Sequence, residues 1–308
     1  MTDIKTDLIQ TKCAICDTDT YDRDLYPANF DPAVLTAEIF SARRMPDRLH
    51  YRIVRCQNCG LVRSNPILNE GTLGRLYAHS FFTYAKESIY AAQTYLAYFK
   101  KILGCIPCTK KEIRLLEIGC GNGFFLKAVH SLGIQEVCGV EPSEDAVSQA
   151  GEFSRHIHCG MFGRDIYPQE YFNIICAFQI FDHISQPNDF LATCMKYLKK
   201  GGTAFFINHD IGSFPARILG RHCPMIDIEH TFLYDKVTFP RIFLKNKFEV
   251  LKVFSVANRY PFSYWLKLAP VSISFKNGLL REISKSRIGN LSLTLRLGNM
   301  GILARRLR

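Results

Sequence analysis

Residues 113–142, IRLLEIGCGNGFFLKAVHSLGIQEVCGVEP, constrain the fold of this chain more than any other stretch. An apolar run of strand length, residues 113–118, is followed by glycines at alternate positions: Gly119, Gly121 and Gly123. Apolar residues between positions 124 and 132 then recur at the three- and four-residue spacings of a helix. A second apolar run, residues 137–140, ends in Glu141. This order predicts a strand–loop–helix–strand unit that binds a nucleotide-like ligand at the carboxyl ends of its strands.

The spacing of the glycines distinguishes between two kinds of nucleotide ligand. The dinucleotide pattern G-x-G-x-x-G would need a glycine at position 124, where the chain has Phe124. The chain instead reads E-x-G-x-G-x-G from Glu117 to Gly123. This resembles the nucleotide loop of class I S-adenosylmethionine-dependent methyltransferases. In that family the acidic residue after the second strand, here Glu141, accepts hydrogen bonds from the ribose hydroxyls. A glycine turn in some other α/β protein is the alternative.

The resemblance covers nearly the whole chain and implies an α/β fold, a seven-stranded Rossmann-like methyltransferase sheet whose last strand is antiparallel. Further strands are expected at residues 156–158, 172–178, 203–207, 248–256 and 298–304. The resemblance also implies contacts to S-adenosylmethionine from Glu117, Gly119, Cys120, Gly121, Gly123, Glu141, Pro142, Met161 and Phe178. Met161 is expected to pack on the adenine, and a place in the core of a loop is its alternative.

Two CxxC pairs indicate a metal site near the start of the chain: Cys13-Ala14-Ile15-Cys16 and Cys56-Gln57-Asn58-Cys59. Four thiolates can hold one tetrahedral Zn²⁺ with no open position, so the ion would be structural. The second pair and the residues after it resemble the second knuckle of the zinc ribbons that precede many small-molecule methyltransferases. Unligated buried thiols are the alternative. A third pair, Cys105 and Cys108, has no partner pair, and no function is predicted for it.

These features divide the chain into three parts. Residues 1–68 form a small N-terminal zinc-ribbon module, and residues 69–110 form a helical lid or linker. Residues 111–308 form the methyltransferase domain, with an insertion at 259–290. In the family the segment before the core commonly covers the cofactor, so Tyr77 or Tyr84 is expected to face the active site.

A histidine beside a carboxylate is the first candidate for a base. The segment around Glu229 and His230 resembles the E-H segment of sugar methyltransferases in deoxysugar pathways, where the histidine and its neighbouring carboxylate act as base. Histidine suits this role because its pKa lies near working pH. His183 ranks second and His209 third, and each could instead be a structural histidine. The reaction implied is methyl transfer to an oxygen or carbon of a small molecule, first of all a sugar or glycan precursor that could be nucleotide-linked.

The net charge of +11 is unevenly distributed. Residues 236–308 contain 15 Lys and Arg against Glu249 and Glu282, which gives this third a net charge of +13. Such a region suits nucleic acid, an anionic membrane surface with peripheral contact, or a phosphorylated substrate, and a solvated face is the alternative.

An RNA methyltransferase is therefore one rival function, because a zinc ribbon and a basic chain allow it. The end of the fourth strand argues against nucleic acid, since it has neither an N-P-P-Y-like motif nor a Pro-Cys motif. A non-catalytic scaffold is the second rival. It is disfavoured by the intact acidic residues and glycines of the nucleotide loop.

The sequence favours a cytoplasmic protein. It contains no run of about 18 apolar residues of the kind that crosses a membrane. The first residues, MTDIKTDLIQTKC, lack the apolar core of a signal peptide. Twelve cysteines without export suggest reduced thiols rather than a disulfide framework.

Overall fold

The computed structural model describes residues 8–30, 39–40, 49–82, 85–104, 106, 108–268, 283, 289 and 291–307. Tyr84, Cys105 and residues 269–282 of the predicted insertion lie outside these ranges. Among the described helices, none is long and apolar enough to span a bilayer.

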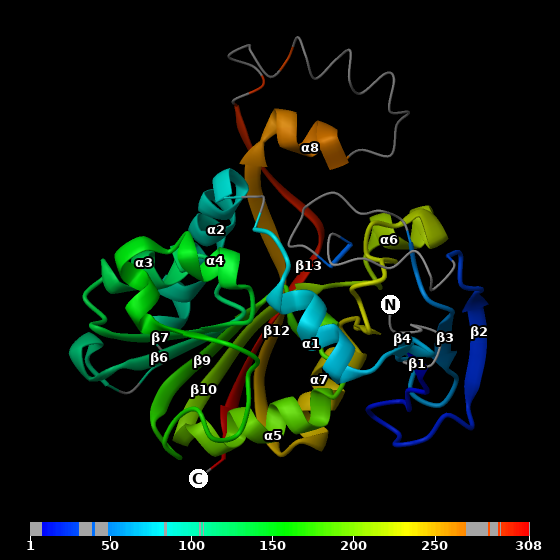
Figure 1. The fold of residues 1–308 in the computed structure, drawn as a ribbon, viewed down its shortest axis with the longest axis horizontal. Helices are drawn as coiled ribbons and strands as arrows, with labels where there is room; N and C mark the ends of the chain where they lie inside the picture. Colours follow the sequence, from blue (N-terminus) through cyan, green and yellow to red (C-terminus); the bar gives the residue numbers. More distant parts are fainter. Residues whose placement is uncertain are drawn as a thin grey trace.

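A seven-stranded sheet forms the centre of the fold, in the order β12-β13-β10-β9-β6-β7-β8 (Figure 1). The strands are β6 Arg114–Ile118, β7 Glu136–Glu141, β8 Ile157–Cys159, β9 Phe172–Phe178, β10 Leu198–His209, β12 Phe248–Pro261 and β13 Ser292–Arg306. The last strand, β13, runs antiparallel to both of its neighbours, whereas β6 to β10 pair in parallel. The predicted Rossmann-like sheet with an antiparallel last strand is confirmed.

Two hydrophobic clusters cover the two faces of this sheet. From Ile174 to Phe178 successive residues of β9 alternate between them: Ile175 and Ala177 lie in one cluster, and Ile174, Cys176 and Phe178 lie in the other. A strand alternates in this way because successive side chains point to opposite faces. Both faces of β9 are apolar, which is typical of a parallel strand that is covered by helices on both sides.

Helices supply the other half of each cluster. Their bounds are α1 Glu70–Ala78, α2 Ala85–Leu103, α3 Phe124–His130, α4 Glu144–Ser148, α5 Pro187–Tyr197, α6 Phe214–Leu219, α7 Thr238–Lys245 and α8 Phe262–Leu268. On one face α2 and α3 contribute Phe99 and Phe125, whose rings meet edge to face at 5.5 Å. On the other face α5 and α7 contribute Leu191 and Phe239, both fully buried.

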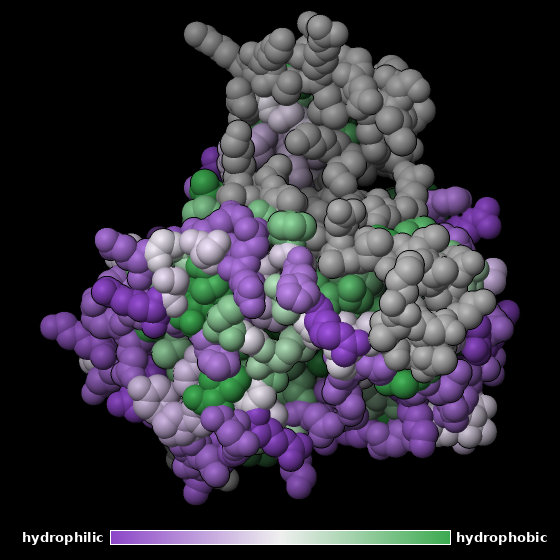
Figure 2. All heavy atoms as spheres, in the orientation of Figure 1, coloured by the Kyte–Doolittle hydropathy of each residue, from purple (hydrophilic) through white to green (hydrophobic). Residues whose placement is uncertain are grey.

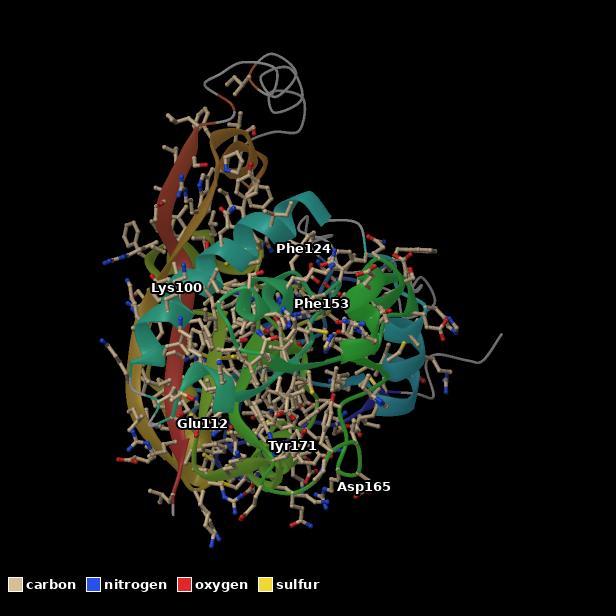
Figure 3. The ribbon with its side chains drawn as sticks, turned by 90° about the vertical axis from the view of Figure 1, so that its left-hand side faces the viewer. Lys100, Glu112, Phe124, Phe153, Asp165 and Tyr171 are labelled. Atoms are coloured by element: carbon tan, nitrogen blue, oxygen red, sulfur yellow. The ribbon has the colours of Figure 1, made fainter. Side chains whose placement is uncertain are left out.

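The strands β12 and β13 are longer than predicted and leave the sheet together. Their pairing continues from Phe248 opposite Arg306 to Pro261 opposite Ser292, so the first residues of the predicted insertion, 259–261, belong to β12. Each strand extends because the other satisfies its backbone hydrogen bonds beyond the sheet. The pair carries α8 at its far end, above the rest of the molecule (Figures 1 and 3).

The N-terminal strands form two small sheets, a pair of β1 with β5 and a four-stranded sheet that includes a late segment of the chain. The strands are β1 Leu8–Ile9, β2 Asp22–Tyr26, β3 Ile53–Cys56, β4 Val62–Ser64, β5 Ile67–Leu68 and the late β11 Phe232–Leu233. Four of them pair in the order β11-β4-β3-β2, on the right of Figure 1. The predicted boundary at residue 68 remains a prediction, and the pairing of β11 with β4 joins the two parts through backbone hydrogen bonds.

Candidate active site

The glycine loop after β6 has the backbone geometry that its sequence requires. Gly119, Gly121 and Gly123 all have positive φ, between +54° and +71°, which side chains of L-residues rarely adopt. A Cβ on Gly119 would lie 2.5 Å from Cγ2 of Ile180, closer than any real contact. Conformation and space therefore both require glycine at position 119.

Gly119→Ala should lower the free energy of unfolding by about 2–5 kcal/mol, because left-handed strain costs about 1–2 kcal/mol and overpacking about 1–3 kcal/mol. Gly133→Ala is a matched control, since Gly133 also has positive φ, at +96°, but a Cβ there would meet nothing within 4 Å. Urea denaturation of both variants measures the difference. An equal loss in the two variants would mean that the contact with Ile180 contributes nothing.

Two carboxylates face the loop from the ends of the strands. Glu141 Oε2 accepts a hydrogen bond from the backbone N–H of Gly121 at 2.8 Å, and its Oε1 accepts one from Ser143 N–H at 3.0 Å. Glu117 is buried, and its Oε2 has no hydrogen-bond partner among the described residues. Burial and the charge of Glu141 raise the pKa of Glu117 well above its usual value. A buried oxygen without a partner is a place for a ligand donor, so this loop fits the S-adenosylmethionine that the sequence predicts.

The segment between α1 and α2 closes over this loop. Ser143 Oγ donates to the backbone oxygen of Ser80 at 2.8 Å, and Asp145 Oδ2 accepts from Phe82 N–H at 2.8 Å. The Phe82 ring lies 3.0 Å from the position that a Cβ on Gly121 would occupy. The segment thus packs on the glycine loop, and its role as a lid remains a prediction.

A cavity of about 1410 Å³ extends from the glycine loop to the carboxyl edge of β10. On the face that Figure 2 shows, apolar side chains gather in the middle of the molecule between hydrophilic margins. The predicted cofactor residues that line the cavity are Glu117, Gly119, Cys120, Gly121, Glu141, Pro142, Met161 and Phe178. The structure places Gly123 away from this lining, where it begins α3. Phe178 stacks on Tyr95 at 4.4 Å, and Met161 is half exposed.

Asp182 lies at the centre of a histidine cluster at the far side of this cavity. Its side chain is fully buried, and its Oδ2 lies 2.6 Å from His209 Nδ1 and 3.8 Å from His230 Nε2. Its Oδ1 lies 3.7 Å from His183 Nε2. Three separate segments meet here: the 3-10 turn Phe181–His183 after β9, the end of β10, and the loop before β11.

The partners of these rings determine where their protons lie. His230 Nδ1 is 2.9 Å from the carbonyl oxygen of Met225, which can only accept, so Nδ1 carries a proton. His183 Nδ1 is 3.3 Å from the hydroxyl of Tyr77, which lines the same cavity. Burial lowers the pKa of His183 to about 3, despite the attraction of Asp182, so this ring is neutral near neutral pH.

The charge of Asp182 follows from the same neighbours. Burial alone would raise the pKa of Asp182, but the nearby rings of His209 and His230 and the hydrogen bond from His209 outweigh it. The pKa of Asp182 is therefore held well below its usual range, and the carboxylate is ionised.

Sequence reasoning did not assign a site role to Asp182. It predicted His230 with Glu229 beside it, and both line the cavity. The carboxylate that approaches the His230 ring is that of Asp182, while Glu229 N–H donates to Asp227 Oδ1 at 3.2 Å. The available signal was the position of Asp182 directly before His183, a few residues after the end of β9.

The four cysteines of the two CxxC pairs lie together, with all Sγ atoms within 4.8 Å of one another. The Sγ atoms of Cys13 and Cys59 are 3.4 Å apart, and those of Cys16 and Cys56 are 3.8 Å apart. Each pair closes a tight turn in which the next residue, Asp17 or Gly60, has positive φ. Four sulfurs at 2.3 Å from a tetrahedral Zn²⁺ would lie about 3.8 Å apart, so the cluster fits this ion.

The first of these turns rests on helices that cover the seven-stranded sheet. Lys245 Nζ on α7 and Asn188 Nδ2 on α5 both donate to the carbonyl oxygen of Ala14, at 2.7 and 3.0 Å. Ser64 N–H donates to Thr231 O, and Ser64 Oγ donates to His230 O, each at 2.8 Å. The N-terminal module therefore holds the backbone that carries His230.

Comparison with known proteins identifies the family. A family model described as a methyltransferase domain matches residues 90–253, more than half of the chain. The ubiquinone biosynthesis O-methyltransferase of Bradyrhizobium sp. (strain ORS 278) is 31% identical over 128 residues, which are 39% of this chain and 48% of that protein. Its counterpart in Rhodopseudomonas palustris (strain TIE-1) is 28% identical over 148 residues, 46% of this chain and 56% of that protein.

The chain thus spans about half the length of the curated relatives it matches. Among solved structures, a protein of Bacillus halodurans titled as a methyltransferase superposes with a TM-score of 0.50 at 15% identity, covering 68% of this chain and 98% of that one. This likeness shows the fold. The chain therefore belongs to the methyltransferase domain family, and its domain is a class I S-adenosylmethionine-dependent methyltransferase.

Proposed function

We propose that this protein transfers the methyl group of S-adenosylmethionine to a hydroxyl oxygen of a small molecule with a substantial apolar part. The observation that carries the proposal is the single cavity that joins the glycine loop and Glu141 to the histidine cluster. Its volume of about 1410 Å³ exceeds the roughly 300–1,000 Å³ of a typical ligand pocket, which leaves room for a cofactor and an acceptor together.

The loop side of the cavity is the proposed cofactor site. The bound cofactor supplies a methyl group on a positively charged sulfur. Glu141 would accept from the ribose hydroxyls with the lone pairs that Gly121 and Ser143 leave open, and Glu117 would accept from a cationic amine. The glycines allow the backbone to approach the ligand, and Met161 would pack on the adenine as predicted.

The acceptor side of the cavity is mostly apolar. Its lining includes Phe40, Leu73, Met225, Tyr260, Tyr264, Trp265 and Leu297. Such a lining favours an acceptor with an apolar part, because hydroxyls buried against it without partners are costly. The O-methyltransferase names of the relatives agree with an oxygen acceptor. The sugar or glycan precursor predicted from the E-H segment gains no support from either observation.

His230 is the proposed proton acceptor. Its Nδ1–H is held by Met225 O, so the lone pair of Nε2 is available on the side of Asp182. The charge of Asp182 would stabilise the imidazolium that forms when the acceptor's hydroxyl loses its proton. Glu229 and His183, the other predicted catalytic residues, line the same cavity and would orient the acceptor. The cavity would hold the oxygen in line with the methyl group at about 3 Å, the distance of a near-attack geometry.

Cofactor binding is tested through Glu141. Glu141→Ala should weaken S-adenosylmethionine binding by about 10- to 100-fold, since the lost hydrogen bonds to a charged group are worth about 1.5–3 kcal/mol. Glu144→Ala is the matched control, because Glu144 is exposed on the neighbouring helix α4. Calorimetry measures both affinities. Unchanged affinity in a folded Glu141→Ala variant would refute this cofactor site.

We also propose that Cys13, Cys16, Cys56 and Cys59 bind one structural Zn²⁺. The spacing of the Sγ atoms and the two similar turns support this proposal. Four thiolates leave no position for a substrate, so the ion would hold the two turns together and take no part in methyl transfer.

A further inference from the structure

One oxygen of the buried Asp182 carboxylate has no hydrogen-bond partner among the described residues. This oxygen is Oδ1, whereas Oδ2 accepts the proton of His209 Nδ1 at 2.6 Å. The side chain has no exposed surface. A buried, ionised carboxylate oxygen without a partner is costly, so something cationic is expected beside it.

Two ring nitrogens lie beside this carboxylate at distances too long for hydrogen bonds. His183 Nε2 is 3.7 Å from Oδ1, and His230 Nε2 is 3.8 Å from Oδ2. One donor atom from each of Asp182, His183 and His230 lies within 4.8 Å of the others. Ligands bound at about 2.1 Å to one tetrahedral ion are about 3.4 Å apart, so the three groups would have to draw together by up to about 1.4 Å to bind it.

The second ring nitrogens of His230 and His183 have the kinds of partner that are usual in metal sites. Metal-ligating histidines usually donate their second ring N–H to a carbonyl or carboxylate, which fixes the ring and its tautomer. His230 donates Nδ1–H to Met225 O at 2.9 Å, so the lone pair of Nε2 is left on the side of Asp182. His183 Nδ1 meets the Tyr77 hydroxyl at 3.3 Å. Lone pairs on Nε2 of His230 and on the carboxylate repel each other unless a cation lies between them.

We propose that Asp182 Oδ1, His183 Nε2 and His230 Nε2 bind a divalent transition-metal ion of the Zn²⁺ or Fe²⁺ type. Two imidazoles and one carboxylate are the donor set of such ions, whereas Mg²⁺ and Ca²⁺ prefer oxygen ligands alone. Three protein ligands leave further positions of the ion open. His183 and His230 both line the cavity, so these open positions would face the acceptor.

The role of this ion rests on the proposed function, whereas its binding does not. A hydroxyl bound at an open position would have a lowered pKa and would lose its proton at neutral pH. The proton would pass to Nε2 of His209, whose Nδ1–H is held by Asp182. The hydroxyl oxygen then forms its bond to the methyl carbon, the bond from that carbon to sulfur breaks, and sulfur keeps the electron pair. When the ion is bound, the lone pair of His230 Nε2 would coordinate it and would no longer be free to accept the proton.

The test is a titration with Co²⁺ alone, without cofactor, of protein whose cysteine cluster is loaded with Zn²⁺. We expect one Co²⁺ per chain, with ligand-field absorption and no sulfur charge-transfer band, which distinguishes this site from the cysteines. Asp182→Asn and His183→Ala should weaken binding by more than about 100-fold, because even changes outside the ligand shell cost 10- to 100-fold. His222→Ala, a matched change of an exposed histidine, should bind Co²⁺ as the unaltered protein does.

Either of two results would overturn the metal site: no Co²⁺ binding in the unaltered protein, or unchanged Co²⁺ affinity in a folded variant. If Asp182→Asn does not fold, His183→Ala decides, since the His183 side chain is 22% exposed and less committed to the core. Calorimetry with S-adenosylmethionine on the same samples separates the two proposals. Absence of cobalt binding in the unaltered protein, with normal cofactor binding, refutes the ion and leaves His230 as the base.

Discussion

His230→Ala should lower turnover by about 10²–10⁴-fold, the usual contribution of general acid–base catalysis, while S-adenosylmethionine affinity stays nearly unchanged. The reason is that the lone pair of His230 Nε2 lies on the side of Asp182. In the proposals this lone pair binds either the acceptor's proton or an ion that in turn binds the acceptor. The cofactor is held elsewhere in the proposal, by Glu141 and the glycine loop. Turnover on the acceptor and calorimetry with the cofactor measure the two quantities separately.

A structural role for His230 must be separated from a chemical one, because the side chain is only 7% exposed and donates to Met225 O. His230→Gln keeps an amide donor for that carbonyl but has no titratable lone pair, so it should remain nearly as inactive as the alanine variant. Melting curves show whether each variant is folded. His222→Ala, on the surface, should retain full turnover. Near-normal turnover in folded His230→Ala would exclude His230 as the base and make His183 the next residue to test.

Cys56→Ser should lose about one Zn²⁺ per chain and a large part of the stability of the N-terminal module. Zinc binding to small Cys-rich modules contributes roughly 10–16 kcal/mol, much of which is folding free energy. Turnover should fall as well, since β4 pairs with β11 and Ser64 Oγ donates to His230 O. Elemental analysis gives the metal content, and a thermal melt gives the loss of stability.

Cys159→Ser is the matched control for the zinc prediction, because Cys159 is exposed and lies outside the four-cysteine cluster. Its metal content and melting temperature should equal those of the unaltered protein. If Cys56→Ser retains all of its zinc, the proposed ligand set is wrong. If the zinc is lost while stability and turnover are unchanged, the module does not support His230 in the way that the hydrogen bonds suggest.

The sequence by itself determined the order of the sheet elements and the nucleotide loop. These features depend on local signals: an apolar run of strand length, glycines at alternate positions, and a helical period after them. The structure has β6, α3 and β7 where those signals stand, with Glu141 at the end of β7 beside Gly121. The two CxxC pairs were equally visible, because each pair closes its own turn within five residues.

Only the tertiary structure decided the composition of the histidine cluster. Asp182 and His209 are 27 residues apart and meet at the ends of the adjacent parallel strands β9 and β10, while His230 arrives from a loop tied to β4. No spacing along the chain encodes which ring nitrogen faces which carboxylate oxygen. The extension of β12 and β13 was hidden for the same reason, since each strand continues only because the other supplies its hydrogen bonds. Contacts between distant segments depend on packing and register, and a single sequence shows neither.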